Sequence, residues 1–178
     1  MVYLFLANGF EECEALVPLD ILRRAKVEIK TVGIGSNTIV GSHGISVNCD
    51  TVNENLSFED LEGIILPGGL PGATNLEADK TVQDAIDYCV SNNLLISAIC
   101  AAPQILGHKG ILNGKNAICF PGFEQELKGA NILNQKVVRD GNIITAWGAG
   151  AAFEFGFEIL SYLSSKDTAN NLQKNMKY

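Results

Sequence analysis

Short apolar runs alternate along the chain with segments whose apolar residues have helical spacing. Val2–Leu6, Gly63–Leu66 and Leu94–Ile99 contain almost no polar residue, which is typical of strands buried on both faces of a parallel sheet. Further strands are expected at 27–34, 115–120, 137–138 and 142–146, and short alternating segments at 38–40 and 45–47 predict a small hairpin or edge strand.

Helices are expected at 15–25, 81–92, 101–110 and 148–164. The first of them follows three glutamates and ends in Arg23 and Arg24, an order of charges that suits the helix dipole. Pro18 lies inside this segment and should kink it, whereas Pro103 falls in a first turn, where proline is tolerated.

The alternation of strands and helices predicts an α/β protein with a mostly parallel sheet and helices on both faces. A length of 178 residues without repeats or linkers indicates a single domain, residues 1–178. Sites in such sheets form at the carboxyl ends of the strands. Three segments lie there, and we expect them to converge: 9–14, 67–69 and Cys100.

Composition excludes several classes of function. Hydrophobic residues make up 47% of the chain, enough for an ordered core, and the net charge of −7 gives no electrostatic footprint for nucleic acid or an anionic membrane. No apolar stretch approaches the roughly 20 residues that span a bilayer. The first residues have neither the basic region nor the cleavage site of a signal peptide, so a soluble cytoplasmic protein is expected.

The cysteines do not form a recognisable disulfide or metal framework. Their number is odd and no pair has the C-x-x-C spacing; they are Cys13, Cys49, Cys89, Cys100 and Cys119. With only two histidines, the chain offers few imidazoles for a metal site built on histidine.

Cys100 stands where a strand turns directly into a helix. This is the setting of a nucleophile elbow, with Ala98 and Ala102 in place of the usual glycines. A helix N-terminus favours the thiolate and lowers a thiol pKa below its usual value of about 8.5. The alternative is a buried structural thiol, because free cysteine is among the most buried residue types.

Neither histidine follows the pattern of a cysteine-protease triad. His108 lies eight residues along the expected helix, roughly 12 Å from Cys100, and only His43 could supply an imidazole. A protonated carboxyl from Glu11, Glu12 or Glu14 could instead donate a hydrogen bond to the thiolate.

Each of these features has a simpler structural interpretation. The three glutamates could merely cap the helix. The backbone N–H groups of 67–69 suit an oxyanion or an oxidised sulfur, but the segment could equally be an ordinary turn.

Four segments together closely resemble motifs of the DJ-1/ThiJ/PfpI superfamily, in its DJ-1-like branch: GFEECEALVPLDILRRA, IILPGGLPGATNL, ISAICAAP and ITAWGAGAAFEFGFEIL. They occur in the same order over nearly the whole chain. The resemblance implies a flavodoxin-like three-layer sandwich and, usually, a homodimer. It places the reactive cysteine at Cys100, the protonated glutamate at Glu14, the backbone donors at Gly69 and Ala101, and a turn that lines the pocket at Gly148–Gly150.

The chain departs from the family pattern at two positions. The protease-like branch has a histidine after the cysteine, where this chain has Ala101, so peptidase activity is not implied. Some relatives carry a histidine where Phe120 stands, which leaves Glu14 as the recognisable acid/base group. Cys49 matches a second, peripheral cysteine of some members, near the dimer contact.

The resemblance implies a cofactor-free enzyme of the glyoxalase III or deglycase type. Its substrates would be methylglyoxal-type 2-oxoaldehydes or glycated side chains. The alternative is an oxidative-stress sensor or redox chaperone whose cysteine is oxidised to sulfinate without turnover. A glutamine-amidotransferase-like domain would share the elbow, but it needs a downstream histidine and glutamate that this chain lacks.

Overall fold

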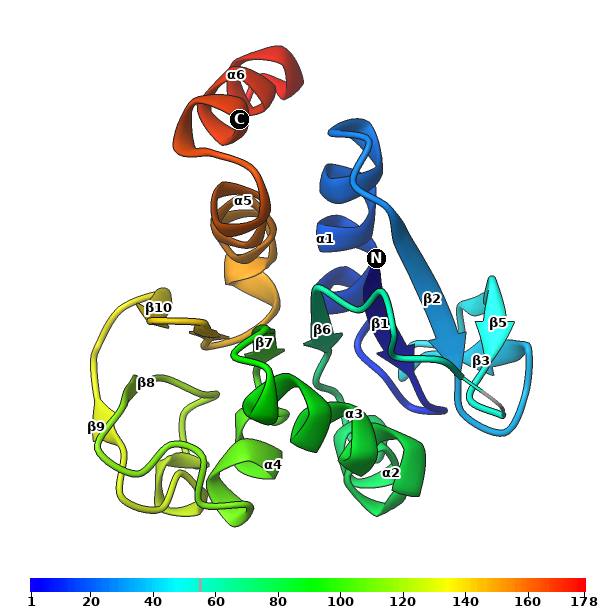
Figure 1. Ribbon diagram of the computed structural model, residues 1–178, viewed down its shortest axis with the longest axis vertical. Coiled ribbons are helices and arrows are strands. Elements are labelled where there is room, and N and C mark those ends of the chain that lie inside the picture. The colour runs from blue at the N-terminus through cyan, green and yellow to red at the C-terminus, as the bar shows by residue number, and fades with distance from the viewer. Residues whose placement is uncertain (55) are drawn as a thin grey trace.

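The computed structural model describes residues 1–54 and 56–178, in which helices cover both faces of a central sheet (Figure 1). The strands are β1 Val2–Leu6, β2 Ile29–Gly33, β3 Thr38–Val40, β4 Ser46–Asn48, β5 Thr51–Val52, β6 Gly63–Leu66, β7 Leu95–Ile99, β8 Asn116–Ala117, β9 Asn131–Ile132, β10 Val137–Asp140 and β11 Ile143–Ala146. The α-helices are α1 Glu12–Arg24, α2 Gly72–Ala78, α3 Lys80–Ser91, α4 Pro103–His108, α5 Ala152–Leu163 and α6 Lys166–Met176. Two short 3-10 helices, η1 Glu124–Glu126 and η2 Ala149–Ala151, complete the elements.

The main sheet has seven strands in the order β10-β11-β7-β6-β1-β2-β5. Its pairings are parallel except at one edge, where β10 runs antiparallel to β11. Helices α1, α5 and α6 lie on one side of this sheet, and α2, α3 and α4 lie on the other (Figure 1). The predicted mostly parallel sheet and flavodoxin-like three-layer sandwich are confirmed.

The helix layer on the first side is closely packed. Gly156 in α5 faces α1, where a Cβ atom on Gly156 would lie 2.7 Å from Ile21 Cδ1 and 3.1 Å from Pro18 Cα. The two helices can approach each other this closely because Gly156 has no side chain. Helix α1 continues through the buried Pro18, so this proline does not end the helix.

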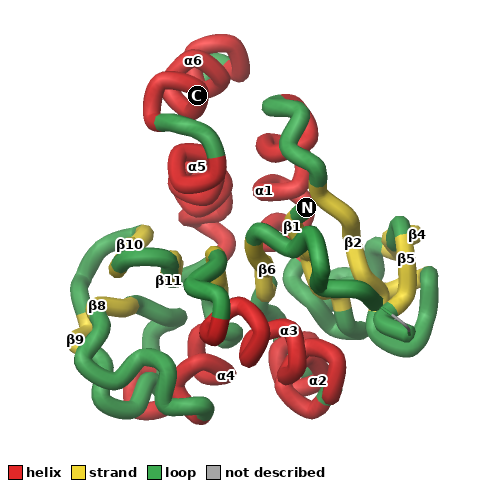
Figure 2. The backbone as a smooth tube through the Cα atoms, viewed as in Figure 1, coloured by secondary structure: helices red, strands yellow, loops and turns green. Residues whose placement is uncertain are grey.

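The expected strand at 115–120 is wrong beyond Ala117. Strand β8 covers only Asn116–Ala117, because the chain then turns toward the main sheet. There the Ile118 N–H donates to the Thr145 hydroxyl at 2.9 Å, and the Phe120 N–H donates to the Cys100 carbonyl at 2.8 Å. Figure 2 shows that loops dominate the chain between β8 and β10.

Two helices have little signal in the sequence. Helix α2 begins at Gly72 after Pro71 without a capping side chain, and α6 is a polar segment, KDTANNLQKNM. The sequence at 148–164 predicts one long helix, but its first turn is the separate η2 and α5 begins at Ala152. The paired segments β3 and β4 confirm the expected small hairpin.

The Thr145 hydroxyl should contribute to stability through its bond to Ile118. Thr145→Val keeps the shape of this fully buried side chain but leaves the Ile118 N–H without a partner. We expect a loss of about 1–3 kcal/mol in the free energy of unfolding, measured by urea denaturation. Thr145→Ser keeps the acceptor and should lose less. A larger loss in the serine variant would show that packing of the methyl group matters more than the hydrogen bond.

Candidate active site

Cys100 lies at a strained turn between β7 and α4. Its φ angle is 64°, in the left-handed region that side chains with a Cβ atom rarely adopt. Two hydrogen bonds hold the backbone in this conformation: the Cys100 N–H donates to the Ala146 carbonyl at 2.9 Å, and its carbonyl accepts from Phe120. The turn has the geometry of the nucleophile elbow that the sequence predicts.

Glu14 lies in the first turn of α1 and only 1% of it is exposed. Its side chain is hydrogen-bonded to the Cys100 thiol, and it accepts from the backbone N–H groups of Gly68, at 2.9 Å, and Ala149. Burial raises the pKa of the Glu14 carboxyl to about 7, although these hydrogen bonds act in the opposite direction. Glu14 therefore changes its protonation state near neutral pH.

The Cys100 sulfur faces both Glu14 and two backbone donors. The N–H groups of Gly69 and Ala101 hydrogen-bond to it, which lowers the pKa of the thiol. Burial and the negative charge of Glu14 outweigh them and raise this pKa to about 12. The low pKa predicted from the helix N-terminus is thus not found beside an ionised Glu14, because burial and the carboxylate charge outweigh the backbone donors.

The two acids titrate as a coupled pair. Burial raises the pKa of the Glu14 carboxyl to about 7, and burial together with the Glu14 charge raises the pKa of the Cys100 thiol to about 12. When the pair holds one proton, that proton lies on either the Glu14 carboxyl or the Cys100 thiol. A thiolate exists to the extent that Glu14 carries this proton.

The side chains of Glu11 and Glu12 have separate structural roles. The Glu11 side chain caps α1 by accepting from the Glu14 N–H at 2.8 Å. Glu12 is buried and accepts from both the backbone N–H and the side chain of His43, each at 2.8 Å. Burial alone would raise the pKa of Glu12, but these hydrogen bonds lower it to about 2. Of the three candidate acids, Glu14 is the one that contacts Cys100.

Both histidines are held by carboxylates. His43 is paired with Glu12, while His108 bridges Glu77 and Glu126, with 2.8 Å between its Nε2 atom and Glu126. The interpretation of His43 as a catalytic imidazole therefore has no support in the described contacts. Glu11, Glu12 and His43 are the one group in residues 1–54 and 56–178 that brings three potential metal ligands together, and two of them already bond to each other.

The remaining cysteines differ in exposure. Burial raises the pKa of the Cys49 thiol to about 11, so its reactive thiolate form is disfavoured. Cys89 and Cys119 are also buried. Cys13 is the exposed thiol, on the outer face of α1, and sequence reasoning did not single it out.

An apolar pocket of about 380 Å³ opens beside the Glu14–Cys100 pair, lined by Phe120, Pro121, Trp147, Gly148, Ala149 and Gly150. A Cβ atom on Gly148 would lie 3.2 Å from the Phe120 ring and 3.9 Å from Glu14 Oε1, which connects the pocket to the acid. The structure thus places Gly148–Gly150 next to Glu14. Sequence reasoning missed Trp147, although it directly precedes this turn.

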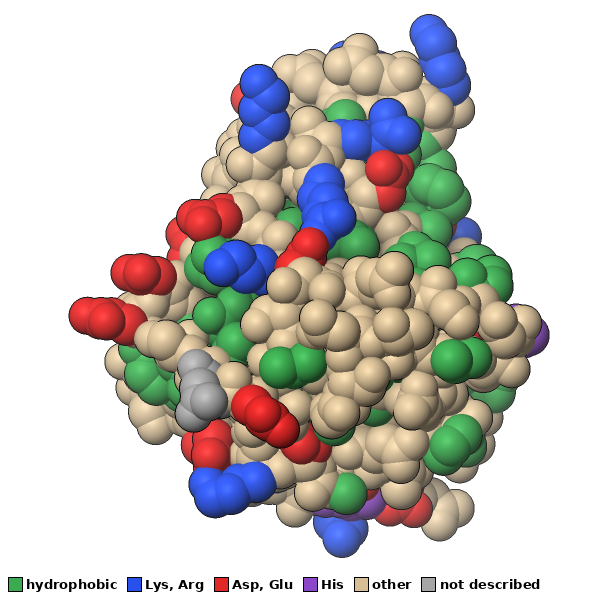
Figure 3. Space-filling view, turned by 90° about the vertical axis from the view of Figure 1, so that its right-hand side faces the viewer, with side chains coloured by type: hydrophobic (Ala, Val, Ile, Leu, Met, Phe, Trp, Pro, Cys, Tyr) green, Lys and Arg blue, Asp and Glu red, His purple; other side chains and the backbone are tan. Residues whose placement is uncertain are grey.

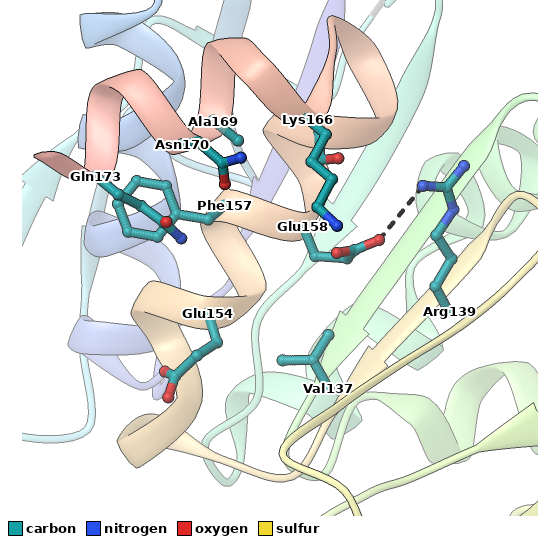
Figure 4. Close-up of a pocket in the computed structure, with 10 residues that line it drawn as sticks. Val137, Arg139, Glu154, Phe157, Glu158, Lys166, Ala169, Asn170 and Gln173 are labelled. Atoms are coloured by element: carbon teal, nitrogen blue, oxygen red, sulfur yellow. Dashed lines mark hydrogen bonds and ion pairs between the residues drawn. The ribbon is translucent and has the colours of Figure 1, made fainter. Parts of the chain in front are cut away.

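A larger cavity of about 520 Å³ lies between β10, α5 and α6 (Figure 4). Its lining is mixed in charge, and Arg139 forms an ion pair with Glu158 across it at 3.3 Å. None of the residues that contact Cys100 lines this cavity. Size alone therefore does not make it the candidate active site.

Surface charge and helix composition are relevant to binding of nucleic acid and of membranes. Figure 3 shows acidic and basic side chains interspersed over one face, without an extended patch of either sign. Over the described ranges, every helix is too short or too polar to cross a membrane.

Comparison with known proteins finds relatives that match most of this chain. The model of the DJ-1/PfpI family matches residues 1–162. Protein dj-1beta of Drosophila melanogaster is 32% identical over 174 residues, which are 96% of this chain and 93% of that protein. Parkinson disease protein 7 homolog of Danio rerio is 31% identical over 169 residues, which are 92% of this chain and 89% of that protein. Protein DJ-1 homologs A and B of Arabidopsis thaliana are longer, and this chain spans 44% and 38% of their lengths.

Solved structures are similar over almost the entire chain. Toxoplasma gondii DJ-1, in its oxidized form, has a TM-score of 0.95 at 27% identity and covers 99% of this chain and 97% of its own. Drosophila melanogaster DJ-1beta has a TM-score of 0.92 at 30% identity and covers 98% of this chain and 96% of its own.

The raised pKa of Glu14 should make stability depend on pH. Glu14 binds its proton more tightly in the folded chain, at about 7, than at the ordinary value of 4.5. The free energy of unfolding should therefore fall by up to about 3 kcal/mol as the pH rises from about 4.5 to about 7. Glu14→Gln should remove this slope, as measured by urea unfolding at a series of pH values.

Glu11→Gln is the matched control, because Glu11 caps the helix without contacting the thiol. This variant should keep most of the slope. An unchanged slope in Glu14→Gln would assign the effect to another group.

Proposed function

The chain belongs to the DJ-1/PfpI family, and we propose that it is a cofactor-free glyoxalase or deglycase with Cys100 as its nucleophile. The family includes both glyoxalases and proteases. The observation that carries the proposal is the buried hydrogen bond between Glu14 and Cys100, which joins a nucleophile to a group that can donate and accept protons near neutral pH.

A peptidase is not supported, since Ala101 occupies the position of the histidine in the protease-like branch and both imidazoles pair with carboxylates. Without an imidazole at Cys100, the carboxyl of Glu14 is the group that can move a proton. Substrates that already carry an electrophilic aldehyde suit this arrangement better than peptides do.

The first proposed step is addition of the Cys100 thiolate to an aldehyde. When Glu14 carries the shared proton, the sulfur is a thiolate that accepts hydrogen bonds from Gly69 and Ala101. It attacks the aldehyde carbon of methylglyoxal, and a C–S bond forms as the carbonyl π electrons move to oxygen. This oxygen takes the Glu14 proton, which gives a hemithioacetal.

The second step moves a proton between two carbons. The Glu14 carboxylate removes the proton from the hemithioacetal carbon, the electrons of that C–H bond form a C=C bond, and the ketone π electrons move to oxygen, which gives an enediolate. The hydroxyl proton on the former aldehyde carbon passes to this oxygen as Glu14 returns its proton to the neighbouring carbon, so the adduct becomes a thioester of the 2-hydroxy acid. Attack by water breaks the C–S bond, releases lactate and regenerates the thiol. Methylglyoxal and one water yield one lactate, and no redox cofactor is required.

Deglycase activity follows from the same chemistry. Early glycation adducts are in equilibrium with free aldehyde and the amine or thiol that carried it. Removal of the aldehyde would reverse the modification, so the substrates include glycated side chains.

A second candidate function is a redox sensor. The Gly69 and Ala101 N–H groups that face the sulfur could equally stabilise oxygen atoms bound to it. Two equivalents of peroxide would carry the thiolate through sulfenic to sulfinic acid, with release of one water at each step. The Toxoplasma gondii relative was solved in an oxidized form.

We also propose that two single-domain chains form a homodimer through the outer face of α1. An apolar pocket of about 330 Å³ lies there, with Leu16, Val17, Ile45 and Phe153 among its lining residues. Ile45 is 52% exposed and Phe153 is 40% exposed, so a second copy would remove large apolar groups from water. Proteins of this family are typically homodimers.

A single substitution that introduces a charge tests the proposed dimer contact. Ile45→Glu should shift the protein toward the monomer, because an ionised carboxylate would be desolvated in the contact. Sedimentation velocity measures the shift. Ile132→Glu alters another exposed apolar residue, in β9, and should leave the mass unchanged. Equal masses for wild type and Ile45→Glu would exclude this face as the contact.

Turnover of methylglyoxal tests the enzyme proposal. Loss of methylglyoxal with formation of lactate should occur over many turnovers in the wild type and fall to the solution rate in Cys100→Ala. Glu14→Gln should lower kcat by roughly 10²-fold or more, since it removes the proton-transfer group.

Cys89→Ala removes a thiol in α3 and serves as the control that should retain activity. One equivalent of lactate or less from the wild type would refute the enzyme. Sulfinate at Cys100 after peroxide treatment, detected by mass spectrometry, would then support the sensor.

A further inference from the structure

Two aromatic side chains line the pocket beside Glu14. Phe120 is 47% exposed, and Trp147 is half-buried. The other lining residues are Pro121 and the turn Gly148–Gly150. Two large apolar rings that share one hollow in this way indicate a binding surface for an apolar group.

Backbone hydrogen bonds place both aromatic residues next to Cys100. The Phe120 N–H donates to the Cys100 carbonyl at 2.8 Å. Trp147 directly follows Ala146, whose carbonyl accepts the Cys100 N–H at 2.9 Å. Each aromatic residue is therefore at most one residue away from a hydrogen bond to the Cys100 backbone, so the aromatic pocket lies beside the turn that carries the thiol.

Among the residues that the structure describes, none that lines this pocket is charged. A carboxylate or phosphate on the substrate would lose its hydration there without gaining an ionic partner. A flat apolar group would instead gain contact with Phe120 and Trp147 through stacked or edge-to-face rings. The chemistry of the pocket therefore selects for aromatic substituents.

We infer that Phe120 and Trp147 form a specificity subsite that favours 2-oxoaldehydes with an aryl group on the ketone carbon. The inference rests on the proposed function for the chemistry at Cys100, but recognition of the ring depends on the pocket alone. Phenylglyoxal is the simplest substrate of this class, and methylglyoxal is the matched substrate that lacks the ring.

The kinetic test compares kcat/KM for phenylglyoxal with kcat/KM for methylglyoxal. The ratio of these values removes effects that are common to both substrates. Phe120→Ala and Trp147→Ala should each lower the ratio about tenfold, because ring contacts with the substrate are lost. Phe120→Tyr and Trp147→Phe keep a ring and should retain most of it. Ile132→Ala, outside the pocket, should leave the ratio unchanged.

A binding test needs no turnover. Trp147 is the single tryptophan of the chain, so its fluorescence reports on this pocket. In Cys100→Ser, which lacks the thiol, mandelate should perturb the emission and bind at least about tenfold more tightly than lactate. These two acids are the products that phenylglyoxal and methylglyoxal would yield.

The outcomes separate the two proposals. Equal affinity for mandelate and lactate, or a ratio of kcat/KM that is the same in all variants, would overturn the aromatic subsite even if both aldehydes are turned over. Selective binding of mandelate in a protein that turns over neither aldehyde would support the subsite and refute the proposed enzyme.

Discussion

The hydrogen bond between Glu14 and Cys100 depends on three chain segments that meet at the carboxyl ends of the parallel strands. Glu14 comes from the first turn of α1, Cys100 from the turn after β7, and Gly68 from the turn after β6. A Cβ atom on Gly68 would lie 2.6 Å from both Glu14 Oε2 and Cys100 Cβ, so the acid and the thiol can meet only where this side chain is absent. The parallel order of β1, β6 and β7 brings these turns to the same side.

Burial gives this contact its chemical character. In water a carboxyl and a thiol would lose their protons independently and far apart in pH. In the closed site, Glu14 holds its proton to a pH of about 7, and Cys100 then loses its own only against the charge of its neighbour. A nucleophilic sulfur therefore requires that the remaining proton be on Glu14. The same requirement applies to addition to an aldehyde and to oxidation by peroxide.

Much of the fold could be predicted from the sequence, because buried parallel strands such as β1 and β6 appear as uninterrupted apolar runs. The position of Cys100 between a strand and a helix was predictable for the same reason. Helix α6 was missed because its polar residues show no apolar stripe that would distinguish it from a loop. The segment after Ala117 was misassigned because its hydrogen-bond partners, such as Thr145, are distant in sequence.

The site was predictable only in part. The sequence alone does not distinguish the roles of Glu11, Glu12 and Glu14. Their roles differ because each side chain leaves the start of α1 in a different direction: Glu11 caps the helix, Glu12 pairs with His43 and Glu14 contacts Cys100. The resemblance to a known family selected Glu14, and the structure gives the physical reason. A protonated carboxyl beside Cys100 was expected, whereas the net rise in the pKa of the thiol was not, since it depends on burial by side chains that several elements contribute.

The positive φ of Cys100 has a consequence for how this protein can change. Glycine adopts that conformation freely, whereas a residue with a Cβ atom occupies it at a cost of about 1–3 kcal/mol. At the position of the proposed nucleophile, heat resistance and reactivity therefore oppose each other. Selection for thermal tolerance alone would favour loss of the thiol, and an engineered heat-stable form would keep its chemistry only if activity were screened at every round.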